Sequence, residues 1–140
     1  VNAVSNQEGS GSEADVFDTV PLGEGDRAVM VGLIAPVAAV LESRGCTVDV
    51  FEHRDVRDER VRPQDALEKS VSRADIIIVT ATSIVNGTLP EILELRNSAR
   101  AVILMGPSTP MLPRAFSSTP VTLLAGSRVI DAAKAMHIVM

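Results

Sequence analysis

The sequence predicts an α/β domain, in which a mostly parallel sheet of five strands lies between two layers of helices. Short apolar segments alternate along the chain with stretches of helical pattern, which is typical of βαβ units. One segment, Ile76–Thr80, is apolar until its last residue, as expected for a central parallel strand covered on both faces. Residues 53–62 are charged, show no strand pattern and are expected to be solvated. We therefore expect the strand order 2-1-3-4-5, with 3-2-1-4-5 as the alternative.

Five segments are predicted strands because they are short, apolar and often β-branched. They are residues 28–31, Thr47–Phe51, Ile76–Thr80, Ala101–Met105 and 121–125. The first ends at Gly32, and the second alternates between apolar and polar side chains.

Proline, glycine and threonine mark the helix boundaries. Pro36 begins a helix that Gly45 follows, which is the usual asymmetry of these two residues. Thr88 and Glu91 match a capping box, in which the Thr88 hydroxyl accepts from the Glu91 N–H and the Glu91 carboxylate accepts from the Thr88 N–H. Further helices are predicted to begin at Pro63 and to span residues 110–116 and 131–136.

The first 24 residues differ from the rest of the chain. Residues 6–13 are Gly, Ser and polar residues without periodicity, as in a linker, whereas Phe17 and Val20 are apolar enough to pack on a domain. We expect residues 1–24 to be a linker or the remnant of an N-terminal domain. Residues 25–140 then form the α/β domain, and the initial valine suggests a processed chain or a fragment.

The composition excludes several classes of protein. With 46% hydrophobic residues among 140, the chain can bury one core and is not disordered over most of its length. A single cysteine, Cys46, excludes a disulfide scaffold and fits the reducing cytoplasm. A net charge of −5, three Phe and no Tyr or Trp argue against nucleic-acid binding. No apolar run reaches the roughly 18 residues of a membrane span.

Small polar residues follow the predicted strands at one edge of the sheet. Ligands of open α/β sheets bind there, outside the carboxyl ends of the strands, and helix N-termini at that edge favour an anionic or carbonyl ligand. The predicted ligand-binding residues are Gly32, Glu52, Thr82, Asn86, Gly87, Thr88, Gly106, Pro107, Ser108, Thr109 and Arg128. Asn86 is the strongest candidate because its amide both donates and accepts hydrogen bonds. Arg128 can pair with a carboxylate or phosphate.

Glu52 supports an alternative function, a nucleotide-dependent enzyme that uses NAD or S-adenosylmethionine. It ends a predicted strand 20 residues after Gly32, where dinucleotide-binding folds place an acid that binds the ribose. The glycine fingerprint for the pyrophosphate is absent, because Leu33, Ile34, Ala35 and Pro36 follow Gly32.

A metal-binding carrier is a further alternative. Its candidate ligands are Glu52, His53, Asp55 and Asp58, but they lie in a charged segment of the kind that is usually solvated, so no metal site is predicted in this chain alone. Cys46 is predicted at the opposite edge of the sheet as a small buried residue. No catalytic residue, cofactor or reaction is predicted.

Five motifs together resemble one protein family. They are Val-Gly at 31–32, Val-Phe-Glu at 50–52, Val-Asn-Gly-Thr-Leu at 85–89, Gly-Pro-Ser-Thr-Pro at 106–110 and Leu-Ala-Gly-Ser-Arg-Val at 124–129. In this order and spacing they resemble the putative heavy-metal chelation family, a domain of unknown function. The resemblance runs from Gly25 to about Ile138 and implies its Rossmann-like C-terminal domain, with Ala81 where the family usually has glycine.

The resemblance also implies a function. Residues 1–6 are similar to the last helix of the family's N-terminal domain, and in two-domain members the cleft between the domains is the suspected small-molecule site. We expect a cytoplasmic small-ligand-binding domain that forms half of such a site. A missing N-terminal domain or a second subunit would complete it, and a homodimer is one form this arrangement can take.

Overall fold

The computed structural model describes residues 16–126 except 108 and 111. The predicted helix at 131–136 and the site candidates Ser108 and Arg128 lie outside the described residues. No helix in the described part of the chain combines the length and hydrophobicity needed to cross a membrane.

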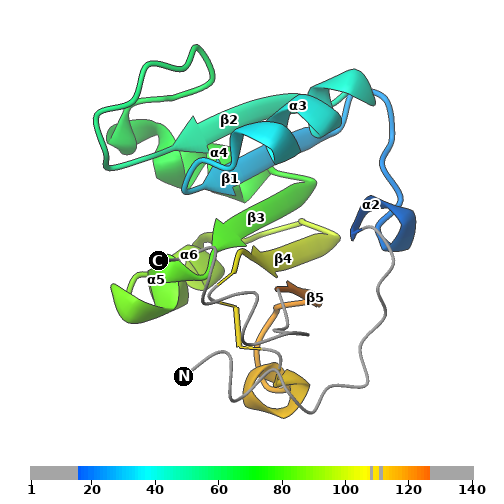
Figure 1. Ribbon diagram of the computed structural model, residues 1–140, viewed down its shortest axis with the longest axis vertical. Helices are drawn as coiled ribbons and strands as arrows, with labels where there is room; N and C mark the ends of the chain where they lie inside the picture. The colour runs from blue at the N-terminus through cyan, green and yellow to red at the C-terminus, as the bar shows by residue number, and fades with distance from the viewer. Residues whose placement is uncertain (1–15, 108, 111, 127–140) are drawn as a thin grey trace, which may run out of the picture.

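Five parallel strands form one sheet in the order β2-β1-β3-β4-β5, which confirms the first predicted order (Figure 1). The strands are β1 (Arg27–Val31), β2 (Thr47–Phe51), β3 (Ile76–Thr80), β4 (Ala101–Met105) and β5 (Leu123–Ala125). The order reverses between β1 and β3, so the connections from these two strands leave the sheet in opposite directions.

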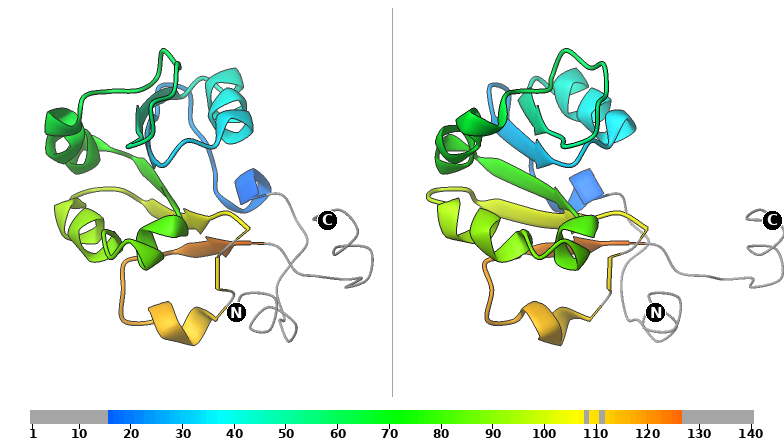
Figure 2. Two further views of the ribbon diagram at one scale, coloured as in Figure 1. Left: turned by 60° about the vertical axis from the view of Figure 1, so that its left-hand side comes forward. Right: turned by 90° about the vertical axis from the view of Figure 1, so that its left-hand side faces the viewer.

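Helices cover both faces of the sheet (Figure 2). One face carries α2 (Val16–Thr19) and α3 (Ala35–Ser43), and the other carries α4 (Leu67–Arg73) and α6 (Leu89–Leu95). Shorter turns complete the chain: η1 (Gln64–Ala66), α5 (Thr82–Val85) and η2 (Pro113–Phe116). Pro36 lies in the first turn of α3 and Gly45 follows its end, as predicted.

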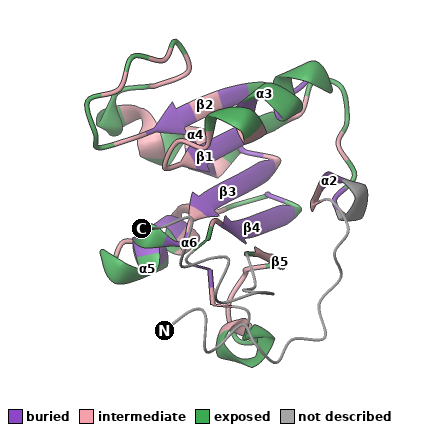
Figure 3. Cartoon of the chain, in the orientation of Figure 1, coloured by how far each residue is buried: buried purple, intermediate pink, exposed green. Residues whose placement is uncertain are grey.

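The core consists of two apolar clusters, one on each face of the sheet, because successive strand residues point to opposite faces. Met30 and Ile78 pack with Leu41 of α3 in the first cluster, whereas Ile77 and Val79 pack in the second. Four residues of β3 are buried, and this confirms its prediction as a central strand covered on both faces (Figure 3).

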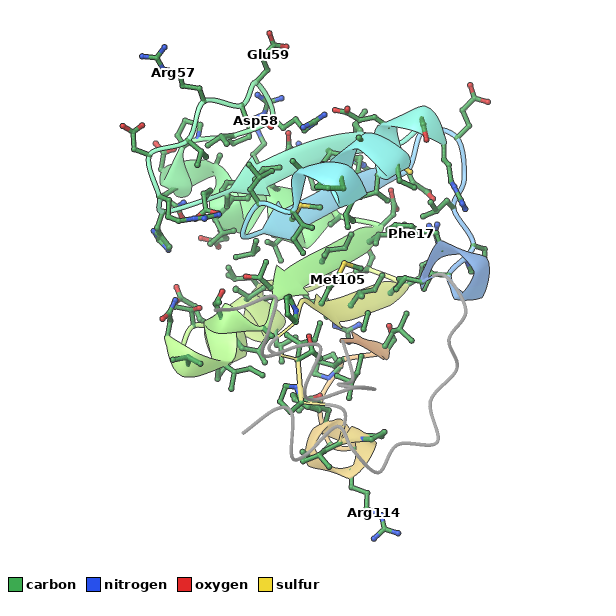
Figure 4. The ribbon with its side chains drawn as sticks, in the orientation of Figure 1. Phe17, Arg57, Asp58, Glu59, Met105 and Arg114 are labelled. Carbon is green, nitrogen blue, oxygen red and sulfur yellow. The ribbon has the colours of Figure 1, made fainter. Side chains whose placement is uncertain are left out.

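The segment before β1 belongs to the first cluster. Phe17 and Val20 are each only 7% exposed, and Phe17, a residue of α2, lies beside the sheet (Figure 4). The Arg44 guanidinium lies 5.9 Å from the Phe17 ring centre and donates a hydrogen bond of 3.2 Å to the Phe17 carbonyl. These contacts confirm that Phe17 and Val20 pack against the sheet.

Two predicted elements are shorter than expected. The strand predicted at 121–125 begins at Leu123, because the Thr122 hydroxyl, not a backbone carbonyl, accepts the Val102 N–H at 2.9 Å. The helix predicted at 110–116 is a 3-10 turn from Pro113. Leu112 is extended, and a residue that precedes proline avoids the helical conformation.

The predicted capping box at Thr88 is wrong. The Thr88 side chain makes no capping hydrogen bond to α6, and its hydroxyl instead donates to the Ser83 carbonyl at 3.5 Å. The short helix α5, which the sequence analysis treated as loop, leads almost directly into α6 and holds Thr88 in helical backbone geometry (φ −92°, ψ −14°). A capping residue needs extended geometry, so the sequence motif cannot act here.

Residues 53–62 are exposed or partly exposed, as predicted, but their backbone also pairs with β2 at one point. The Val50 N–H donates to the Arg60 carbonyl at 2.9 Å, and the Arg62 N–H donates to the Val50 carbonyl at 2.8 Å. An isolated parallel bridge therefore joins Val61 to Val50 at the outer edge of β2. The pattern was not recognised because a single bridge residue has no periodicity.

Candidate functional site

A pocket of about 480 Å³ opens at the carboxyl ends of β1, β3 and β4, where the strand order reverses. We call it the edge pocket. It is lined by Val31, Gly32, Leu33, Ile34, Phe51, Glu52, His53, Arg54, Thr80, Ala81, Thr82, Ser83, Asn86, Thr88, Met105, Gly106 and Pro107. The sequence analysis placed a ligand site at this edge of the sheet.

The structure brings most of the described candidate residues together. Those that line the edge pocket are Gly32, Glu52, Thr82, Asn86, Thr88, Gly106 and Pro107. Gly87 and Thr109 are not part of its lining, and Thr109 is fully buried.

Gly32 allows β1 and β3 to approach each other at the base of the pocket. Its φ of +89° is a conformation that other residues rarely adopt. A Cβ atom at this position would lie 2.3 Å from the Thr80 Oγ1. In dinucleotide-binding folds a glycine at this turn makes room for a pyrophosphate, whereas here the room is taken by the Thr80 side chain.

Glu52 braces two walls of the pocket. Its carboxylate accepts hydrogen bonds from the Leu33 N–H (2.9 Å), the Arg54 N–H (3.1 Å) and the Arg54 guanidinium (2.9 Å). The Arg54 guanidinium is the main reason that the Glu52 pKa falls from 4.5 to about 2, and the two backbone N–H groups add to the shift. The Glu52 side chain is only 9% exposed.

This bonding gives Glu52 a structural task in place of the ribose contact that its position suggested. The carboxylate accepts from the N–H of Leu33, one residue before the N-cap of α3, so it lies close to the positive end of that helix. It also bonds the turn after β1 to the segment after β2, so it links the two walls. No observation on the described residues favours the nucleotide-dependent alternative.

Hydroxyl groups form the wall that follows β3. The Thr80 and Thr82 hydroxyls lie 2.8 Å apart and share a hydrogen bond. Ser83 is 4% exposed, and its hydroxyl has no hydrogen-bond partner among the described residues. Ala81, where the family usually has glycine, has φ −63° and donates its N–H to the Met105 carbonyl, so this position does not require glycine.

Four polar residues of the lining, His53, Arg54, Thr80 and Ser83, were not among the predicted ligand-binding residues, and His53 was considered only as a metal ligand. Thr80 and Ser83 belong to the same Thr/Ser-rich segment as Thr82, and only the start of α5 turns Ser83 inward. Arg54 was assigned to the solvated segment, although it stands two residues after Glu52. An arginine so close to a strand-end acid is a signal that could have been used.

The donor set does not fit a metal centre. The described residues contain no group of three or more His, Cys, Asp and Glu that could hold a metal ion. In the edge pocket the two candidates are Glu52 and His53, and Glu52 already accepts three hydrogen bonds. Cys46 is buried near the other end of β2, where burial raises the pKa of its thiol.

Comparisons with known proteins agree with this architecture. The chain is 29% identical over 112 residues to an uncharacterized protein of Methanocaldococcus jannaschii, covering 79% of this chain and 43% of that protein. Its fold is similar to that of a DUF364 protein of unknown function from Pyrococcus horikoshii, with a TM-score of 0.81 and 29% identity over 91% of this chain and 52% of the other. A DUF364 protein of unknown function from Desulfitobacterium hafniense gives a TM-score of 0.74 and 32% identity over 91% and 50%.

The chain thus spans about half the length of the relatives it matches. The family profile itself covers residues 15–140, which includes every described residue. The chain belongs to the DUF364 family, which carries the description "Putative heavy-metal chelation".

Proposed function

We propose that this chain is a small-molecule-binding domain and that its ligand occupies the edge pocket. The observation that carries the proposal is the buried Ser83 hydroxyl, which lacks a hydrogen-bond partner among the described residues. Buried polar groups are normally satisfied, and a change of rotamer can redirect a serine hydroxyl toward a bound molecule. The neighbouring Thr82, Asn86 and Thr88 offer further donors and acceptors.

The ligand that fits these groups is an organic molecule with polar substituents. Apolar side chains such as Val31, Phe51 and Met105 line the rest of the pocket, which is the usual composition of a small-molecule site. The family description names heavy-metal chelation, but the described residues contain no group of metal ligands that could hold such an ion.

We also propose that a second domain or subunit completes this site. The relatives are about twice as long as this chain, and two apolar side chains of α5, Ile84 and Val85, are 37% and 84% exposed beside the polar wall. Exposed apolar side chains next to a pocket favour an interface there. Sedimentation over a range of concentrations tests the homodimer, and a monomer at every concentration would leave only a separate domain or a different subunit.

A fragment screen followed by amide chemical shifts tests the ligand site. We expect fragments to shift the amides of residues 80–88, and Asn86→Ala to weaken their binding roughly tenfold, the effect of losing one or two hydrogen bonds. Asn97→Ala is the matched control, because Asn97 is also exposed and is not part of the pocket lining. Fragments that shift other regions only, or equal binding by both variants, would contradict the proposal.

A further inference from the structure

The charge of the edge pocket is unlike that of the chain as a whole. The chain carries a net charge of −5, yet Glu52 is the one acidic residue of this lining, against Arg54 and His53. Glu52 accepts hydrogen bonds from three N–H groups, so its charge is already compensated within the protein. A cation therefore finds no carboxylate without partners in the lining, whereas an anion finds an arginine that uses only one guanidinium nitrogen to pair with Glu52.

Glu52 holds the Arg54 guanidinium in place and leaves some of its N–H donors available for a ligand. Its backbone N–H and one guanidinium nitrogen both bond to Glu52, which fixes the start and the end of the side chain. The side chain is nevertheless 70% exposed, and its remaining guanidinium N–H groups have no partner among the described residues. A planar guanidinium with unused N–H groups binds carboxylates and phosphates in a two-point contact.

The opposite wall offers a different kind of contact. The hydroxyls of Thr80, Thr82 and Ser83 and the Asn86 amide are uncharged and can both donate and accept. These groups suit the hydroxyl or carbonyl groups of a ligand, and they suit an anionic group less well than Arg54 does.

We propose that the ligand of the edge pocket is a small organic anion that also carries hydroxyl or carbonyl groups, with Arg54 as the residue that binds the anionic group. This inference rests on the proposed function and adds the ligand class to it. The shared chemistry is an oxyanion, supplied by a carboxylate or by a phosphate ester. Glu52 acts as the positioning residue, since it holds Arg54 beside the pocket.

Four probes separate these cases: L-malate, glycerol 3-phosphate, and their neutral counterparts malamide and glycerol. Each is titrated into the 140-residue chain, and binding is followed through the amide signals of residues 80–88. We expect saturable binding of at least one anion and binding of its neutral counterpart that is roughly tenfold weaker or more, the effect of a lost charge-assisted contact. Preference for malate identifies the carboxylate, and preference for glycerol 3-phosphate identifies the phosphate ester.

Arg54→Gln is expected to weaken anion binding by about tenfold or more and to leave binding of neutral fragments unchanged. Arg57→Gln is the matched control, because it removes the same charge three residues away, where the side chain points outward from the 53–62 segment (Figure 4). If Arg54→Gln does not fold, Arg54→Lys keeps the charge without the planar fork, and we expect weaker anion binding from it as well.

The double variant Glu52→Gln/Arg54→Gln distinguishes a direct contact from charge compensation. If Arg54 binds the anion, the double variant stays as weak as Arg54→Gln. If Arg54 serves only to neutralise Glu52, removing both charges restores anion binding, and the inference is wrong.

The remaining outcomes separate this inference from the proposed function. Equal binding of anions and neutral counterparts, or fragments that bind in the pocket while no anion does, would overturn the anion proposal and leave the small-molecule site standing. A screen in which nothing shifts residues 80–88 would overturn both.

Discussion

The edge pocket and a second region outside β2 both pair arginines with acids, and they differ in what the pairs do. The edge pocket contains the Arg54–Glu52 pair. The second region, which we call the β2 groove, is a depression of about 690 Å³ outside β2. It is lined by Glu42, Cys46, Thr47, Val48, Asp49, Arg57, Asp58, Glu59, Arg60 and Arg62.

In the β2 groove the ion pairs fasten one segment to the sheet. Arg60 bonds both oxygens of Glu42 at 2.9 and 3.0 Å and also bonds Asp58, while Arg62 bonds Asp49 at 2.8 Å. Arg60 and Arg62 there have carboxylate partners, whereas Arg57 has none among the described residues and points outward (Figure 4). Exposed pairs of this kind contribute little to stability, since water competes for both charges.

In the edge pocket the acid is nearly buried and the arginine is exposed. The Glu52 side chain is 9% exposed and that of Arg54 is 70% exposed, whereas Arg60 and Glu42 are 23% and 43% exposed. A nearly buried acid with three donors stabilises the fold, and an exposed arginine with unused donors is left for a ligand. Both regions therefore contain arginine–acid pairs, and the burial of Glu52 is what distinguishes the edge pocket from the ion pairs of the β2 groove.

The largest expected effect is that of Gly32→Ala, which adds a methyl group at the base of the edge pocket. The positive φ and the contact of 2.3 Å with the Thr80 Oγ1 together predict a loss of about 4 kcal/mol in the free energy of unfolding. Gly87→Ala is the control, with φ +70° and open space around its Cβ, and should lose about 1 kcal/mol. Urea denaturation measures both. Equal losses would mean that β1 and β3 do not meet as described.

Glu52→Gln tests whether the Glu52 carboxylate stabilises the walls of the edge pocket. It should lower the free energy of unfolding by about 2 kcal/mol at neutral pH, because the Leu33 N–H and Arg54 lose a charged acceptor. The pKa of Glu52 is lowered from 4.5 in the unfolded chain to about 2 in the fold, so its contribution is complete above pH 4.5. It is lost as the pH falls from about 4.5 to about 2. Denaturation at several pH values should show the difference between native chain and variant shrinking over that range. A constant difference would refute the charged brace.

Arg60→Gln should lower the free energy of unfolding less than Glu52→Gln does, by about 0.5 to 1 kcal/mol, because its partner Glu42 is 43% exposed whereas Glu52 is 9% exposed. Added salt should reduce this loss further by screening the pairs. The same denaturation series with and without salt measures it. If Arg60→Gln lowered the free energy of unfolding more than Glu52→Gln, the β2 groove pairs would stabilise the fold more than the Glu52 pair, contrary to the comparison above.

The smallest expected effect is that of Thr88→Ala, which should change the free energy of unfolding by less than about 0.5 kcal/mol, because no capping bond is lost. Thr122→Ala is the contrast. Its hydroxyl accepts the Val102 N–H and donates to the Val102 carbonyl, so about 1 kcal/mol should be lost. A larger loss in the free energy of unfolding for Thr88→Ala would mean that the Thr88 side chain does cap α6.

Much of the fold could be predicted because local pattern and tertiary packing agree along the strands. Continuous apolar residues predicted β3 as a central strand and β4 as a strand, and both are buried at nearly every position. The strand order followed from the absence of a strand pattern at 53–62. The edge of the sheet that holds the pocket follows from strand order alone, since all strands are parallel.

The details of the candidate site depended on contacts that are distant in sequence. Thr88 has the local signature of a cap, but the path from α5 into α6 decides its backbone geometry. Arg54 was predicted to lie in a solvated segment, and Gly32 was predicted to be a ligand-binding residue. Each role was decided by a partner brought near by the sheet, Glu52 in one case and Thr80 in the other.

The sequence by itself determined the α/β class, the parallel strands, the family and the edge of the sheet at which the pocket lies. The physical reason is that hydrophobic periodicity and turn residues act within a few positions along the chain. Only the tertiary structure decided that Glu52 is braced within the protein, that Arg54 remains exposed and that the Ser83 hydroxyl is buried on the pocket wall. Burial and hydrogen-bond satisfaction depend on which strands become neighbours, and composition alone does not carry that information.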